Sequence, residues 1–86
     1  MHPAVEVVFW RYDNMSKQIL SPEKIGEKVK HLLKEQNITQ DAFADLAYVD
    51  VRTVRRWLTG SGLDRISNVT SCANALCVDV MTILFE

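Results

Sequence analysis

The chain has 86 residues, of which 48% are hydrophobic and 24% are charged, and its formal net charge is −1. This length suits one compact domain with a modest core, excludes two separate cores and favours a homodimer. No segment approaches the roughly 20 apolar residues that span a bilayer, and no secretory signal is recognisable, so we expect a cytoplasmic protein that does not enter a membrane.

Residues 1–20 are predicted to be an N-terminal arm. Residues 4–12 read AVEVVFWRY, and their β-branched and aromatic side chains favour an extended β-strand whose two faces are both partly apolar. One interpretation is that the strand pairs with the same strand of a second subunit; another is that it packs against its own domain. A disordered arm and an extra helix are further alternatives. The candidate dimerisation residues are Val5, Val7, Phe9 and Trp10.

Residues 21–86 are predicted to form an all-α domain of five helices with short connections. Ser21-Pro22, Thr39 and Asp50 are typical of helix starts, and glycines at 60 and 62 end the third helix. The predicted helices run from Pro22 to about Asn37, from Thr39 to Leu46, from Val51 to Thr59, from about Asp64 to Leu76, and around residues 80–84. The expected core residues are Ile25, Val29, Leu32, Leu33, Phe43, Leu46, Ala47, Val54, Trp57, Leu58, Ile66, Val69, Ala73, Leu76, Val80, Ile83 and Leu84.

The third predicted helix has two chemically different faces. At 100° per residue, three apolar side chains gather around one direction and three arginines gather roughly opposite. The apolar set is Val54, Trp57 and Leu58, and the basic set is Arg52, Arg55 and Arg56. Because three like charges on one exposed face repel each other, a polyanionic partner gives a physical reason for the pattern, whereas the alternative is a merely solvated charged face.

The connection before this helix is short. Residues 47–49 leave just enough chain for a sharp turn between the second and third helices, which is the geometry of a helix-turn-helix. Ala44 lies where two steeply crossing helices would come close, and such a contact needs a small side chain. The alternative is an ordinary helix-forming alanine.

From Ile25 to Leu84 the chain resembles the phage-repressor (Xre, Cro and cI) helix-turn-helix family, with no gap in the register. The resemblance implies a lambda-repressor-like fold and a transcriptional regulator that binds double-stranded DNA. The matching residues are Ile25-Gly26, Val29-Lys30, Ile38-Thr39-Gln40-Asp41-Ala42-Phe43-Ala44, Val49-Asp50, Thr53-Val54, Arg56-Trp57, Gly60 and Ala73-Asn74-Ala75-Leu76-Cys77-Val78.

The resemblance also implies roles for individual residues. Gln40, at the start of the second helix, would contact a phosphate and set the register without reading a base. The third helix would enter the major groove, where arginine reads guanine and valine meets a thymine methyl group. The candidate base-contacting residues are Val51, Arg52, Arg55 and Arg56, and the candidate phosphate-contacting residues are Thr39, Gln40, Thr53 and Thr59.

Two departures from the family pattern bear on this interpretation. Tyr48 stands where the family has glycine, so a left-handed turn there costs about 1 kcal/mol or more, and the turn could differ. Asp50 replaces serine and would place a negative charge near the phosphates. Together with the low net charge, Tyr48 favours an alternative function, namely a protein-interaction module such as an antitoxin or anti-repressor that binds a protein partner through the arm.

Enzymatic function and bound cofactors are not expected. Cys72 and Cys77 are five residues apart, on different faces of a helix, and the two histidines are isolated, so we expect two buried, reduced thiols and no metal site. The sequence also lacks a glycine-rich phosphate loop and a nucleophile with a plausible histidine and acid. His31 is expected on a solvated side of the first helix.

Overall fold

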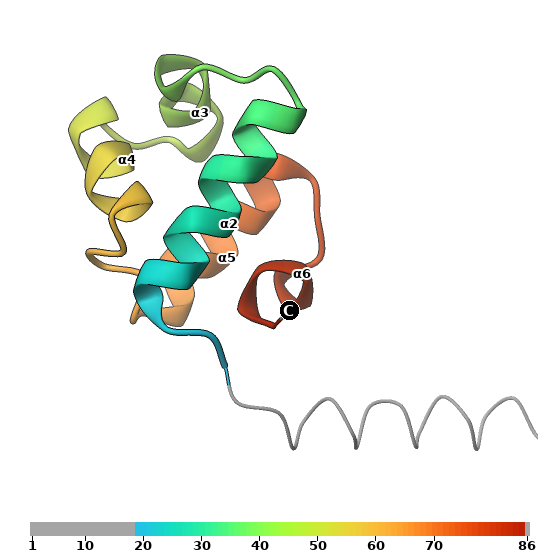
Figure 1. Cartoon of the computed structure of the whole chain (residues 1–86). Helices are drawn as coiled ribbons and strands as arrows, with labels where there is room; N and C mark the ends of the chain where they lie inside the picture. The colour runs from blue at the N-terminus through green and yellow to red at the C-terminus, as the bar shows by residue number, and fades with distance from the viewer. Residues whose placement is uncertain (1–18, 86) are drawn as a thin grey trace, which may run out of the picture.

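A computed structural model describes residues 19–85, and this part of the chain is an all-α globule of five helices (Figure 1). The helices are α2 (Pro22–Glu35), α3 (Gln40–Ala47), α4 (Val51–Leu58), α5 (Ile66–Leu76) and α6 (Val80–Leu84). The described residues contain no strand, and the predicted strand at residues 4–12 lies outside them. None of the helices in residues 19–85 is both long enough and apolar enough to cross a membrane.

Short polar side chains start four of the five helices, as the sequence indicates for the first three. Ser21 Oγ accepts from the Lys24 amide at 3.3 Å, and Thr39 Oγ1 accepts from the Ala42 amide at 3.1 Å. Asp50 and Asp79 cap α4 and α6 in the same way. These bonds satisfy amide groups that have no partner inside the first helical turn, so the boundaries are encoded locally. α5 is the exception, because its preceding residue, Arg65, makes no capping bond.

Three helices end on a non-glycine residue in the left-handed conformation. Asn37, Tyr48 and Cys77 have φ of 56°, 58° and 58°, and each is followed by a partly buried aliphatic residue. After α3, the Tyr48 amide donates to Asp45 O and the Val49 amide donates to Ala44 O, which is the paired bonding of a Schellman motif. The turn after α3 therefore keeps the left-handed geometry that glycine usually provides, despite the tyrosine.

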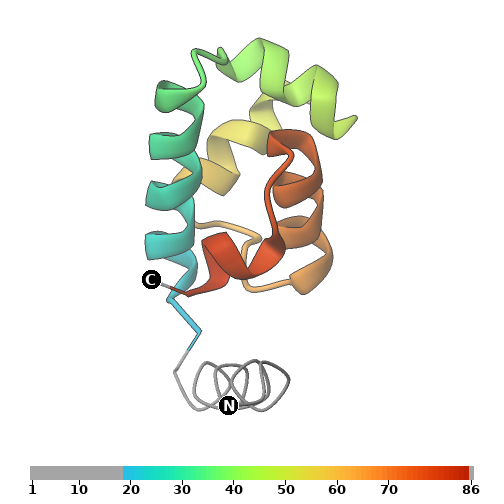
Figure 2. The ribbon, with the colours of Figure 1, turned by 90° about the vertical axis from the view of Figure 1, so that its right-hand side faces the viewer.

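The core is formed by all five helices around α2 and α5. α2 packs against α4, α5 and α6, while α3 packs against α4 and α5 (Figure 2). The fully buried large side chains include one phenylalanine and seven aliphatic residues, and every helix and the loop before α5 contribute at least one of them. They are Ile25, Val29, Phe43, Val54, Leu63, Val69, Leu76 and Ile83.

Two residues that we expected in the core are exposed. Leu46 on α3 has half of its surface in solvent (50%), because α3 turns Phe43 and Ala44 inward instead. Ile66 is 59% exposed because it is the first residue of α5, at the edge of the buried face. The prediction was also wrong about the start of this helix, which begins at Ile66 rather than near Asp64. Leu32, Ala47 and Val80 are half-buried against the core.

Candidate functional site

α4 lies at the outer edge of the bundle and has one buried and one exposed face (Figure 1). Val54, Trp57 and Leu58 are buried in the core. The exposed face carries Arg52, Arg55 and Arg56. The separation of the two faces that periodicity predicts is therefore present, and three guanidinium groups stand on a surface that the rest of the domain leaves open.

These three arginines have no acidic partner among residues 19–85. The single contact within 4.0 Å between a basic and an acidic side chain in that range joins His31 Nε2 to Glu35 Oε1, at 3.0 Å, on the exposed side of α2. Arg52 and Arg56 are separated by one helical turn, and like charges at that spacing destabilise a helix by about 0.2–0.5 kcal/mol per pair. The exposed face of α4 thus concentrates positive charge at some expense to the stability of the free protein.

Other predicted base-contacting and phosphate-contacting residues on α4 are less accessible than the arginines. Val51 and Thr53 are half-buried, and Val51 packs partly against the core. Thr59 is exposed, but its hydroxyl donates to Arg56 O at 2.7 Å and so closes the end of α4. Among the predicted residues on α4, Arg52, Arg55 and Arg56 are consequently the ones that face solvent with free donor groups.

The start of α3 carries the remaining predicted phosphate contacts. Thr39 and Gln40 are both exposed, and the Thr39 hydroxyl is occupied as the helix cap. Gln40 is the first residue of α3, and the other seven residues of the helix place it about 11 Å from Ala47 along the helix axis.

Close backbone contacts hold α4 against the first helix. A Cβ atom added at Gly26 of α2 would lie 2.7 Å from Trp57 O and 2.9 Å from Leu58 O. Gly60, just after α4, has φ of 99° and lies against the backbone of Glu23. Because neither position has room for a side chain, glycine at both sites fixes the end of α4 relative to α2.

A polar pocket of about 420 Å³, which the sequence did not indicate, lies between the end of α4 and the start of α5. Arg56 and Arg65 line it together with Thr53, Ser61 and Asp64. Arg65 was not among the predicted contact residues, although it closes the local run of basic residues that begins at Arg52. The pocket thus adds a second cationic group beside Arg56.

The two cysteines differ in environment, and the prediction of two buried thiols was wrong for one of them. Cys72 is buried in α5, and this burial raises the pKa of its thiol to about 12. Cys77 is exposed because it is the left-handed residue that ends α5. Within residues 19–85, no group of three or more histidine, cysteine, aspartate or glutamate side chains is placed to hold a metal ion.

The candidate dimerisation residues Val5, Val7, Phe9 and Trp10 lie outside the described residues. The predicted DNA contacts, by contrast, are all described, and they occupy α4 and the start of α3. Comparison of the chain with family models, with curated proteins and with solved structures gave no match.

Proposed function

We propose that this protein is a sequence-specific DNA-binding regulator in which α3 and α4 form a helix-turn-helix and α4 reads the major groove. The observation that carries the proposal is the exposed face of α4, where Arg52, Arg55 and Arg56 stand without an acidic partner in residues 19–85. The buried face opposite fixes the rotation of the helix, so the guanidinium groups cannot turn inward. A helix of this width fits the major groove of B-form DNA.

The connection between α3 and α4 supports the same proposal. Only residues 48–50 separate the two helices, and Ala44 is buried near this turn. A small residue at the helix crossing and a three-residue turn are features of a helix-turn-helix, the geometry of the lambda-repressor-like fold that the sequence resembles. In this arrangement Gln40 would contact a phosphate, and Arg52 and Arg56 would contact guanine O6 and N7.

We further propose that the protein acts as a homodimer. Two copies related by a twofold axis would place their α4 helices in successive major grooves about 34 Å apart, so the binding site would be palindromic. Selection of bound duplexes from a random pool tests this directly, since enriched sequences should contain two inverted half-sites at that spacing. Recovery of unenriched sequences would contradict specific DNA binding.

The roles of individual residues are tested on the selected duplex by fluorescence anisotropy. Arg52→Ala or Arg56→Ala should weaken binding by about 1–3 kcal/mol, roughly 5- to 150-fold, and relax base choice. Gln40→Ala should weaken binding to all duplexes alike. Lys24→Ala is the matched control, because it removes one exposed positive charge from α2, outside α4. Equal losses on selected and random duplexes for the arginine variants would refute their base-reading role.

The alternative is a protein-interaction module, such as an antitoxin or anti-repressor. The exposed apolar side chains at the end of α3 favour it, because Leu46 is 50% exposed and Tyr48 is 94% exposed. DNA binding depends on released counterions and weakens steeply as salt rises. Undetectable binding to any duplex at low salt would therefore favour the protein-interaction module over the DNA-binding regulator.

A further inference from the structure

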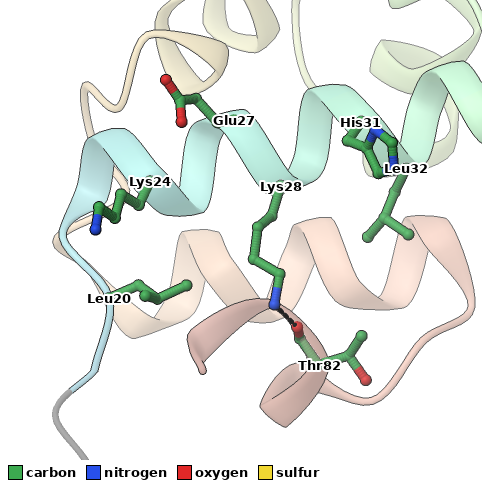
Figure 3. Close-up of a pocket in the computed structure, with 7 residues that line it drawn as sticks. All are labelled: Leu20, Lys24, Glu27, Lys28, His31, Leu32 and Thr82. Atoms are coloured by element: carbon green, nitrogen blue, oxygen red, sulfur yellow. Dashed lines mark hydrogen bonds between the residues drawn. The ribbon is translucent and has the colours of Figure 1, made fainter. Parts of the chain in front are cut away.

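A groove of about 440 Å³ lies between α2, α6 and the residues that precede α2 (Figure 3). Leu20 and Leu32 contribute apolar surface, and the aliphatic parts of Lys24 and Lys28 extend it, while Glu27, His31 and Thr82 complete the lining. Lys28 reaches across to α6, where its Nζ donates to Thr82 O at 2.6 Å and also to Phe85 O. Because the ammonium group is directed at the end of α6, the methylene groups of Lys28 are left to line the groove.

This groove faces away from the candidate DNA-binding helix. In Figure 1, α4 and α6 lie on opposite sides of α2, and in Figure 2, α6 is in front while α4 is behind. Whatever occupies the groove would therefore leave Arg52, Arg55 and Arg56 uncovered.

An apolar segment of the chain precedes, in the sequence, the residues at the edge of the groove. Eighteen residues precede Ile19, and the Leu20 amide donates to Leu84 O of α6 at 2.8 Å, which holds the entry point against the groove. Residues 4–12 are strongly apolar, whereas residues 13–18 read DNMSKQ and begin with two turn-forming residues. Six extended residues reach about 20 Å, and the groove from Lys24 to Leu32 measures about 12 Å along α2.

We propose that the chain folds back through a turn in residues 13–18 and that the apolar residues next to this turn, residues 8–12, pack into the α2–α6 groove of the same chain. Five extended residues span about 13 Å, which matches the length of the groove. The tether is short enough to give an effective concentration in the millimolar range, which a second copy reaches only in concentrated solution. The packing would place apolar side chains on Leu20 and Leu32 and would shield Ile19, which is 58% exposed.

The alternation of side chains along residues 4–12 suggests how this packing fits a dimer. If these residues are extended, Val8, Trp10 and Tyr12 share one face, and Val5, Val7 and Phe9 share the other. In this packing Trp10 faces the groove, and the face with Phe9 and the backbone edge of the segment are left for a second subunit. It does not depend on DNA binding.

Trp10 fluorescence in the full chain tests the proposal. The chain has two tryptophans, and the second, Trp57, is buried, so the Trp10→Phe variant gives the signal that has to be subtracted. We expect an acrylamide quenching constant for Trp10 several-fold below that of N-acetyltryptophanamide, and we expect the same value across a dilution series. A constant equal to that of the free amide would overturn the proposal. If the protection of Trp10 from quenching disappears at concentrations where the protein is monomeric, the groove is occupied by a second copy, and the proposal is also overturned.

A pair of variants locates the binding surface. Thr82→Glu puts a carboxylate on the wall of the groove, where an apolar occupant would strip its water, so quenching of Trp10 should rise toward that of the free amide. Thr70→Glu makes the same change at an exposed position of α5 outside the groove and should leave quenching unchanged. Helical circular dichroism verifies that both variants are folded. Equal quenching in the two folded variants would contradict packing in this groove.

Discussion

Replacement of Tyr48 by glycine should stabilise the protein, because the tyrosine occupies a left-handed position and buries almost nothing. Its φ and ψ are 58° and 41°, and its side chain is 94% exposed. The left-handed conformation costs an L-residue about 1–2 kcal/mol, whereas the greater freedom of glycine in the unfolded chain costs about 0.5–1 kcal/mol. The net expected gain in unfolding free energy is about 0.5–1 kcal/mol, equivalent to roughly 2–8 °C in Tm for a domain of this size.

Urea and thermal denaturation, followed by circular dichroism at unchanged m value, measure this gain. Ala42→Gly is the matched control, because it introduces the same residue at an exposed right-handed position of the same helix and should cost about 1 kcal/mol. Cys77→Gly should reproduce the gain, since Cys77 is exposed and has φ and ψ of 58° and 40°. A folded Tyr48→Gly variant that is less stable than the parent would refute the reasoning, because it would require a stabilising contact of the tyrosine ring.

Three further predictions concern the packing of α4, its charge and the buried thiol. Gly26→Ala should destabilise the fold by about 1–3 kcal/mol in urea titrations, because its Cβ would lie 2.7 Å from a main-chain oxygen of α4; an unchanged midpoint would contradict the close approach. Asp50→Asn keeps a capping side chain but removes a negative charge at the start of α4. The affinity of the variant for every duplex should therefore exceed that of the parent at low salt and equal it at high salt. Equal affinities at low salt would show that Asp50 lies away from the phosphates. Burial raises the pKa of Cys72 from 9.0 to about 12, so the folded state disfavours the thiolate. The free energy of unfolding should therefore fall as the pH rises above about 9, by up to ~1.4 kcal/mol per pH unit. Cys72→Ala should flatten that slope, and an identical slope in the variant would assign it to other groups.

Helix boundaries were the part of the fold that the sequence predicted best, because they depend on neighbouring residues. Ser21, Thr39 and Asp50 each accept an amide hydrogen bond at the start of their helices, as their positions before apolar periodic segments indicate. Such bonds form within one turn and need no tertiary contact. The start of α5 was misplaced for the same reason, since Arg65 provides no capping bond from which the boundary could be read.

The choice of buried face was harder to predict where small residues make the contact. On α3, Ala44 and Leu46 point in nearly opposite directions, about 160° apart, and hydrophobicity alone favours burying the leucine. The structure buries Ala44, on the side of α3 that packs against α4 and α5, and leaves Leu46 in solvent. On α5, Ile66 lies about 70° from the centre of the buried face, so it belongs to the apolar pattern and yet remains exposed.

The arginine face of α4 could be predicted because eight residues of regular helix fix the angles between side chains. The polar pocket beside Arg56 and the α2–α6 groove could not, since each combines residues that are distant in sequence. Thr82 lies more than 50 residues after Leu20, and only the packing of α6 onto α2 brings them to one groove.

The hydrogen bond from the Leu20 amide to Leu84 O joins the first and last parts of the described domain, on the side away from α4. A domain with adjoining ends accepts a fused protein, or a new linkage between those ends, without displacement of its core. Purification tags or fluorescent labels attached at residue 19 or residue 85 would therefore emerge on the side away from the arginine surface. A circularly permuted domain, with new ends in the loop between α4 and α5, would need only a short linker from residue 85 to residue 19.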